Sequence, residues 1–171
     1  MTVLDIVTYP ADILKEGAED VANIDDSVQK LIEDMADTMY TRSGIGLAAV
    51  QVGSRHRIVI YDIAEEREKR AYIAIINPRI LSGEGEVLSE KEGCLSVPEF
   101  RTDVNRYARI ELEGLDRDGN KFKKTIDGFE ATVLQHEIDH LNGVLILDHA
   151  SRLKRELYKK KVNKWLKQAQ T

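Results

Sequence analysis

Two histidines and a glutamate occur at a spacing that suits a metal centre. The segment Gln135–Leu141 reads Gln-His-Glu-Ile-Asp-His-Leu, so His136 and His140 are four residues apart with Glu137 between them. In an α-helix, residues four apart lie one turn apart on the same face, so two imidazoles can share one metal ion. Glu137 would then lie beside the metal as a candidate general base. The alternative is a helix with polar residues near its inner face and no ligand.

The surrounding residues predict the helix that this motif needs. Apolar side chains recur at helical spacing through residues 129–142. We expect Asp127 to cap the first turn with Glu130, at the spacing of a capping box, and Gly143 to follow the last turn. Two histidines and a glutamate are costly on a largely apolar, buried helix unless something pairs them, and a metal ion would do so.

A third protein ligand has to come from elsewhere, because a catalytic zinc-type site uses three and keeps one position open for water. The metzincin pattern would place a histidine where this chain has Ile146, and the only downstream glutamate, Glu156, lies in a strongly basic segment. Cys94 is the only cysteine. It could be an inert core thiol, a nucleophile or a ligand. Ligation explains the cysteine and the three helical residues together.

The rest of the chain reads mostly as strands. Gly93 and Pro98 bracket a short apolar run that favours a strand entering from a turn. Further strands are expected over 57–63, 71–77, 109–115 and 121–126, with a charged connection at 65–70 and an Asp-Gly turn within 116–120. A helix is expected over 27–40, capped by Asp26 or Ser27. Strands followed by a helix, without β-α-β alternation, favour an α+β fold.

Charge is concentrated at the C-terminal end. Residues 151–171 carry eight Lys or Arg and one Glu, a net +7, so the remainder is −12 because the whole chain is −5. Ser151 is expected to cap a long helix. The residues expected on its apolar side are Leu153, Leu157, Val162, Trp165 and Leu166. This helix either packs on the body as an ordinary amphipathic helix or also contacts ribosomal RNA through its basic residues 152–167.

Length and composition favour an ordinary globular protein. With 171 residues, 42% apolar and 32% charged, we expect one domain over residues 1–171. No apolar run approaches about 18 residues, so a membrane span is not expected. The N-terminus shows no signal or transit peptide, which leads us to expect a cytoplasmic location. A DNA partner is not expected either.

Three motifs together resemble the bacterial peptide deformylases. They are Gly44-Ile45-Gly46-Leu47-Ala48-Ala49-Val50-Gln51, Glu92-Gly93-Cys94-Leu95-Ser96 and Gln135-His136-Glu137-Ile138-Asp139-His140. All three are complete, and the resemblance covers nearly the whole chain. It implies antiparallel sheets around a central metal-binding helix, followed by a long C-terminal helix, as in the subtype that lacks a large insertion.

The resemblance implies a reaction as well as a fold. Deformylases remove the formyl group from the N-terminal formyl-methionine of newly made proteins and release formate. Cys94, His136 and His140 would hold one divalent ion, with Fe²⁺ expected in the cell and Zn²⁺, Ni²⁺ or Co²⁺ in preparations. A hydroxide on the metal would attack the formyl carbon, with Glu137 as general acid and base. Gln51 and the Leu95 backbone N–H would stabilise the oxyanion.

Substrate-binding residues are also carried over by resemblance. The peptide main chain would pair with the segment around Ile45 and Gly46 as an added strand. The methionine side chain would enter a pocket at positions matching the family, with Arg101 at its edge. The pocket residues are Ile45, Phe129, Thr132 and Val133, with His136 at the back.

Five further residues have weaker expectations. Asp139 is expected to be structural and paired with Arg106, and Glu92 to orient the Cys94 turn. His56 and His149 are expected on the surface. Two rival functions stay open: a general metallo-endopeptidase, and a non-catalytic ribosome-associated protein with a structural metal.

Overall fold

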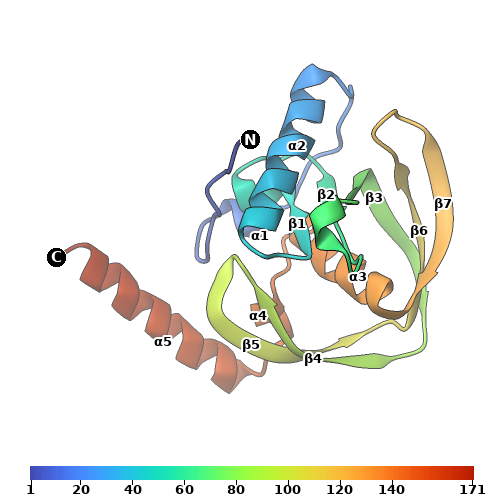
Figure 1. The fold of residues 1–171 in the computed structure, drawn as a ribbon. Coiled ribbons are helices and arrows are strands. Elements are labelled where there is room, and N and C mark those ends of the chain that lie inside the picture. Colours follow the sequence, from blue (N-terminus) through green and yellow to red (C-terminus); the bar gives the residue numbers. More distant parts are fainter.

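Two antiparallel sheets wrap around one helix in this computed structural model, which describes residues 1–171 (Figure 1). The larger sheet has the order β1-β2-β3-β6-β7, and β4 pairs with β5 in the smaller sheet. The strands are β1 (Gly46–Ala48), β2 (Ile58–Tyr61), β3 (Ile73–Glu84), β4 (Val87–Cys94), β5 (Val97–Arg106), β6 (Arg109–Leu115) and β7 (Lys121–Asp127). The α+β expectation, with antiparallel sheets around a central helix and a long C-terminal helix, is confirmed.

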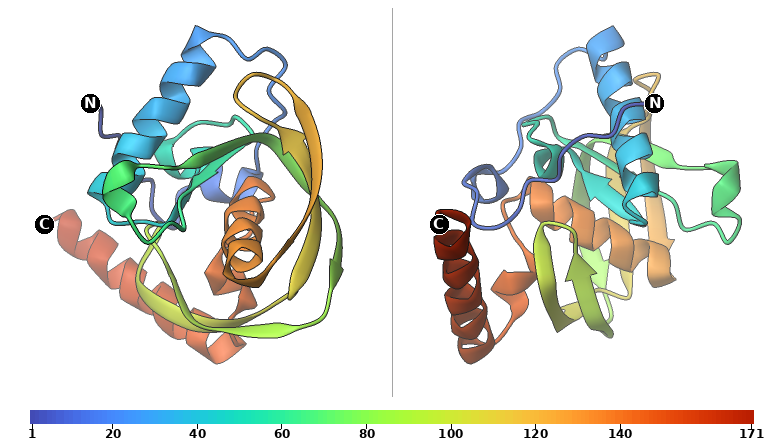
Figure 2. Two further views of the ribbon diagram at one scale, coloured as in Figure 1. Left: turned by 45° about the vertical axis from the view of Figure 1, so that its right-hand side comes forward. Right: turned by 60° about the vertical axis from the view of Figure 1, so that its left-hand side comes forward.

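The helices lie inside and around these sheets. Their bounds are α1 (Ile13–Glu16), α2 (Asp26–Thr41), α3 (Gly128–Leu141), α4 (Ile146–His149) and α5 (Arg152–Ala169), with short 3₁₀ turns η1 (Ala49–Val52) and η2 (Arg67–Lys69). Figure 2 shows the sheets curving around α3, while α2 lies outside them and α5 runs along one side of the molecule. None of the helices is both long enough and apolar enough to cross a membrane.

Strand β2 is buried on both faces because a helix covers each of them. Val59 and Tyr61 belong to the apolar cluster that contains the α3 residues. Ile58 and Ile60 belong to the cluster that contains the buried side of α2. Alternate side chains of a strand point to opposite faces, so the run Ile-Val-Ile-Tyr serves both layers. Each such apolar side chain contributes about 1.5–3 kcal/mol on burial, which holds α3 firmly against the sheet.

Helix α5 packs through only part of the predicted apolar side: Val162 is buried and Trp165 packs against the same cluster, as expected. Tyr158 and Val162 are its buried residues, and the Tyr158 hydroxyl donates to the Pro98 carbonyl at 2.9 Å. Leu153 and Leu157 are 71% and 58% exposed. The expected apolar side is therefore wrong for these leucines and for Leu166, which is also exposed. Tyr158 lies at the centre of the contact instead, because its ring can be buried while its hydroxyl keeps a hydrogen-bond partner. The predicted Ser151 cap is confirmed, since its side chain accepts the Lys154 N–H.

The ends of α2 and α3 differ in detail from expectation. Asp25, not Asp26 or Ser27, caps α2 by accepting the Val28 N–H. Asp127 precedes α3 as expected, but its side chain makes no capping hydrogen bond. Its expected partner in the capping box, Glu130, instead accepts a hydrogen bond from the Tyr61 hydroxyl at 2.7 Å. The tertiary contact has replaced the local one.

Strand positions were predicted more closely than strand ends. The strand over 109–115 and the 116–120 turn are confirmed, whereas β3 is longer than 71–77 and β2 is shorter than 57–63. The expected strand entering at Gly93 is wrong: β4 ends at Cys94, and the chain turns at Leu95 and Ser96 before β5.

Candidate active site

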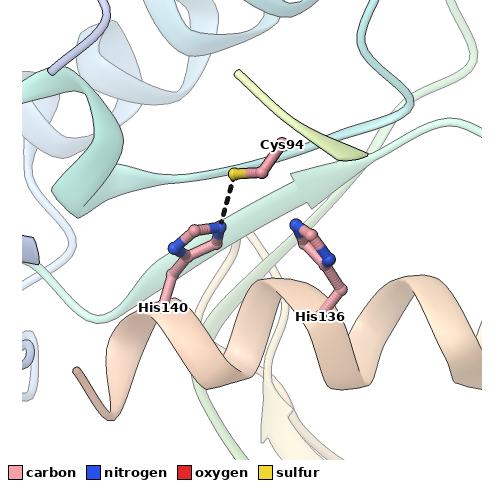
Figure 3. Close-up of side chains that lie close together, drawn as sticks. All are labelled: Cys94, His136 and His140. Carbon is pink, nitrogen blue, oxygen red and sulfur yellow. Dashed lines mark hydrogen bonds between the residues drawn. The ribbon is translucent and has the colours of Figure 1, made fainter. Parts of the chain in front are cut away.

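One cysteine and two histidines meet above the inner helix. The sulfur of Cys94 and one ring nitrogen from each of His136 and His140 all lie within 4.8 Å of one another. The Cys94 Sγ atom is 3.3 Å from the Nε2 atom of His140, and Figure 3 shows both imidazoles directed towards the sulfur. The structure thus brings together the three residues that the sequence predicts as metal ligands.

Two elements deliver these groups. Helix α3 presents His136 and His140 on one face, as the four-residue spacing requires. Strand β4 ends at Cys94, and the two-residue turn to Val97 places the thiol over that face. Gly143, with φ 75°, ends α3 in the left-handed region as expected, and a Cβ there would lie 2.4 Å from the Lys15 carbonyl oxygen. The C-terminal end of α3 is therefore held against the N-terminal segment.

The donor set fits a divalent metal ion. A thiolate and two imidazoles are ligands that zinc, iron, nickel and cobalt all accept. His140 is buried, and burial together with the nearby His136 lowers its pKa well below the usual value. One carboxylate oxygen of Glu137, which is itself buried, has no hydrogen-bond partner in the protein. Such an atom is costly to bury unless a further group meets it.

Glu137 has the surroundings of a general base. Burial raises the pKa of its carboxyl to about 7. Proton transfer is most efficient when the pKa of the catalytic group lies near the working pH. Gly46 approaches so closely that a Cβ at this position would lie 2.5 Å from a Glu137 oxygen. The glycine therefore leaves room for the carboxylate.

A buried arginine organises the outer side of the site. Arg106 donates to both oxygens of Glu92, at 3.0 and 2.8 Å, and to Asp139 at 2.6 Å. Glu92 in turn lies 2.9 Å from the Nδ1 atom of His136. This contact fixes the ring so that Nε2 is left for a metal. Burial opposes ionisation of Glu92, but His136 and Arg106 outweigh it and lower its pKa to about 2.

The expected pairing of Asp139 with Arg106 is confirmed. Glu92 binds a histidine ring as well as the arginine, and its expected role in orienting the Cys94 turn stays a prediction. His149 is exposed, as expected, yet its Nε2 atom lies 2.9 Å from the Asp139 carboxylate. Sequence spacing offered no signal for either histidine contact, since both join residues on different elements or turns.

Neutralising Glu92 should weaken the site without unfolding it. We expect Glu92→Gln to lower metal affinity by about 10- to 100-fold, the usual cost of losing a partner of a ligating histidine. Metal titration by calorimetry measures this. Glu86→Gln, an exposed residue just before β4, is the matched control and should leave the affinity unchanged. Equal affinities in the two variants would show that Glu92 does not orient His136.

Gln51 lies against the cysteine. Its side chain is 2% exposed, and its amide nitrogen is 3.2 Å from the Ser96 Oγ atom and 3.5 Å from the Cys94 Sγ atom. Its amide oxygen accepts the Ala48 N–H at 2.9 Å, which fixes the direction of the nitrogen. A donor is therefore held rigidly beside the candidate metal ligands.

A cavity of about 590 Å³ opens over this group of residues. Its lining includes Cys94, His136, Glu137, Gln51 and Leu95 from the candidate catalytic set. It also includes all six of the predicted substrate-binding residues, which are Ile45, Gly46, Arg101, Phe129, Thr132 and Val133. The structure thus gathers the predicted site residues, apart from His140, around one opening, and a buried His140 lies directly behind the sulfur.

The rim of the cavity combines apolar and cationic groups. Phe129 and Ile45 are 60% and 40% exposed, so apolar surface flanks the entrance. Arg101 lies across Gly93, where a Cβ would come within 2.8 Å of its guanidinium, and it donates to the Lys91 carbonyl at 3.2 Å. This contact braces the β4–β5 hairpin next to Cys94.

A group of possible metal ligands and a buried carboxylate at the base of one cavity is the arrangement expected of a metal-dependent hydrolase. The polypeptide deformylase family model matches residues 3–156. A peptide deformylase of Desulfosudis oleivorans is 63% identical over 99% of this chain and 98% of its own length. Crystal structures of peptide deformylases from Legionella pneumophila and, in complex with actinonin, from Ehrlichia chaffeensis align with TM-scores of 0.88 and 0.87. The Legionella enzyme is 42% identical, and the alignment covers 99% of both chains. The Ehrlichia enzyme is 43% identical, and the alignment covers 96% of this chain and 98% of that enzyme's chain.

The chain therefore belongs to the polypeptide deformylase family. Enzymes of this family use a divalent metal to remove N-formyl groups from newly made peptides. The expected activity, hydrolysis of the formyl group of N-terminal formyl-methionine, is confirmed at this level.

Proposed function

We propose that Cys94, His136 and His140 hold the catalytic metal ion of this deformylase and that Glu137 moves the protons of the reaction. The observation that supports this most strongly is the meeting of the three ligand atoms within 4.8 Å beside a buried carboxylate. A divalent ion bound there acts as a Lewis acid and lowers the pKa of water towards neutrality. Glu137 accepts the proton of the attacking water and later delivers it to the departing amine.

The oxyanion that forms from the formyl oxygen needs fixed donors. Gln51 offers its amide nitrogen, and Leu95 offers its backbone N–H from the turn between β4 and β5. Donors that are already held in place stabilise developing charge more than mobile water does. The short turn and the Ala48 contact supply that rigidity in this chain.

Removing the Gln51 amide should slow the chemical step. We expect Gln51→Ala to lower kcat by about 100- to 1,000-fold, which corresponds to about 2.7–4 kcal/mol, with little change in bound metal. Formate release and metal analysis measure the two quantities. Ser96→Ala removes a contact of Gln51 but keeps its amide, and should have a much smaller effect. An unchanged kcat in Gln51→Ala would make this residue structural.

The substrate pocket follows from the same cavity. The methionine side chain enters among Ile45, Phe129, Thr132 and Val133, and Arg101 lies at the edge near the emerging peptide. Gly46 lies in the edge strand β1, which can accept an added strand on its free side. Membership of the deformylase family supports hydrolysis of a formyl group over cleavage between amino acids, as in a general endopeptidase.

Ferrous iron is the metal proposed for the enzyme in the cell, on the basis of the family resemblance. The Cys94 thiolate also makes zinc, nickel and cobalt compatible with the site. Metal analysis of protein purified without oxygen tests this proposal. Activity that disappears in air for the iron form and persists for the nickel form would agree with it, because thiolates and Fe²⁺ are both open to oxidation.

Helix α5 is proposed to bring the enzyme to its substrate in the cytoplasm. Residues 1–171 form one catalytic unit in this proposal, and α5 presents basic side chains from 152–167 on its exposed side. Basic residues bind phosphate backbones without base readout. The exposed side also carries Leu153 and Leu157, which sit among the lysines. A ribosomal RNA surface close to the emerging nascent chain fits this combination.

Charge reversal on α5 should separate ribosome binding from catalysis. We expect Lys160→Glu with Lys164→Glu to abolish co-sedimentation with ribosomes and to leave formate release from a free peptide unchanged. Binding of the unaltered protein should weaken steeply as salt rises. Lys123→Glu with Lys124→Glu on β7 is the matched control and should still co-sediment. Loss of binding in both variants would mean that net charge, not α5, is responsible.

A further inference from the structure

The connection between β2 and β3 folds back onto the segment that precedes β1. Asp62, which is 2% exposed, begins this connection and accepts a short hydrogen bond from the Tyr40 hydroxyl at the end of α2. It also accepts the Ala64 N–H at 2.9 Å, which turns the chain back. Its own N–H donates to the Ile45 carbonyl at 2.9 Å. Residues 62–72, here called the brace loop, are thus attached at their start to the edge strand.

The middle of the brace loop reaches the same segment with a side chain. The guanidinium of Arg67 lies over the Tyr40 ring, 5.3 Å from its centre, and donates to the Gly44 carbonyl at 2.5 Å. Arg70 also lies over this ring, at 4.8 Å, but pairs with Asp37 instead. Stacking on an aromatic ring restricts an arginine side chain and directs its donors. The Arg67 side chain is therefore held in position to donate to the Gly44 carbonyl.

The contacts of the brace loop set the direction of the next peptide groups. The two carbonyls before Gly46, those of Gly44 and Ile45, are both bound by the brace loop. In an antiparallel pair, alternate residues direct their N–H and C=O groups towards and away from the partner strand. Ile45 is hydrogen-bonded to Asp62, the residue that directly follows β2. The N–H and C=O groups of Gly46, the next residue, therefore point away from β2. That is the free side of β1, and Gly46 lines the active-site cavity.

Glycine makes this bracing necessary. Gly44 has more backbone freedom than any other residue type, so the peptide unit after it could rotate readily without an external partner. Met39 holds the Gly44 N–H through its carbonyl at 2.9 Å, and Arg67 holds the Gly44 carbonyl. Of these two contacts, only the second depends on a side chain and can be removed by substitution.

We propose that Arg67 is a positioning residue for the substrate main chain. It does not line the cavity, so it acts through β1. By holding the Gly44 carbonyl it fixes the Gly44–Ile45 peptide unit, and together with the Asp62 contact this sets the direction of the Gly46 groups that pair with substrate residues after the methionine. The inference rests on the proposed pairing of substrate with β1 and adds a residue outside the three sequence motifs to that site.

The experiment compares two substrates, formyl-methionine amide and formyl-Met-Ala-Ser, with metal-loaded enzyme. The unaltered protein should show a lower KM for the longer peptide. Arg67→Ala should raise the KM of the tripeptide about tenfold, the effect of one charge-assisted hydrogen bond. The KM of the short substrate and both kcat values should stay the same, because α3 and Cys94 are untouched. Arg67→Lys keeps a donor and should recover part of the loss.

Arg70→Ala is the matched control. It removes an arginine from the same ring and the same loop but leaves the Gly44 carbonyl bound, so the KM of the tripeptide should not change. A tripeptide KM that is unchanged in Arg67→Ala, or a loss that is equal for both substrates and accompanied by a lower melting temperature, would overturn the positioning role. If the unaltered protein itself does not distinguish the two substrates, the pairing of substrate with β1 fails, and the role of Arg67 fails with it.

Discussion

Glu137→Gln should keep its metal and lose almost all of its turnover. A general base contributes about 100- to 10,000-fold to rate, so kcat/KM should fall by a factor in this range. Glutamine has nearly the same shape as glutamate, and Glu137 is not one of the three residues whose ligand atoms cluster, so metal content should remain at one equivalent. Formate release and metal analysis on the same sample measure both quantities.

The control for this experiment is on the same helix. Glu130→Gln removes a carboxylate that contacts the Tyr61 hydroxyl near the start of α3 and should leave turnover close to that of the unaltered protein. If Glu137→Gln retained full activity, another group would have to accept the proton of the attacking water. If it lost its metal, Glu137 would be a ligand and not a base.

Cys94→Ser should lose most of its affinity for metal. A neutral hydroxyl donates far less charge to a metal ion than a thiolate does, and removing even an outer contact of a ligand costs about 10- to 100-fold in affinity. We therefore expect a loss larger than that for Glu92→Gln. Competition with a coloured chelator measures the affinity of both variants.

His149→Ala provides the contrast for the cysteine variant. His149 contacts Asp139 at the edge of the same network but lies outside the group of three ligand atoms. It should bind metal as the unaltered protein does. A Cys94→Ser protein that bound metal and released formate normally would remove Cys94 from the proposed ligand set.

Local patterns predicted the parts of the site that lie within one element. The spacing of His136 and His140 needs only an α-helix to bring them together, and the structure places them on one face of α3. The single cysteine was identified because both familiar positions for a third ligand, Ile146 and Glu156, were unsuitable. Glu156 pairs with Lys159 on α5, so it is engaged elsewhere.

Contacts between elements could not be predicted in this way. Glu92 meets His136 only because the fold brings β4 close to α3, and Arg67 meets Gly44 only because the brace loop folds back. No periodicity links such residues. Apolar spacing on α5 was ambiguous for a related reason, since Leu153 and Leu157 fit an apolar stripe as well as Val162 does, and the body of the protein selected only one face.

We propose that this protein hydrolyses the formyl group of a formyl-methionyl peptide and needs one metal ion, held by Cys94 of β4 and the two histidines of α3, to do so. The most direct measurement is to incubate the metal-loaded protein with formyl-Met-Ala-Ser and to quantify formate, new amino groups and peptide fragments together. We predict one formate for each new N-terminal methionine, no cleavage between amino acids, and no reaction once the metal is removed. Cleavage within the peptide without formate, or formate release that continues after metal removal, would contradict this account.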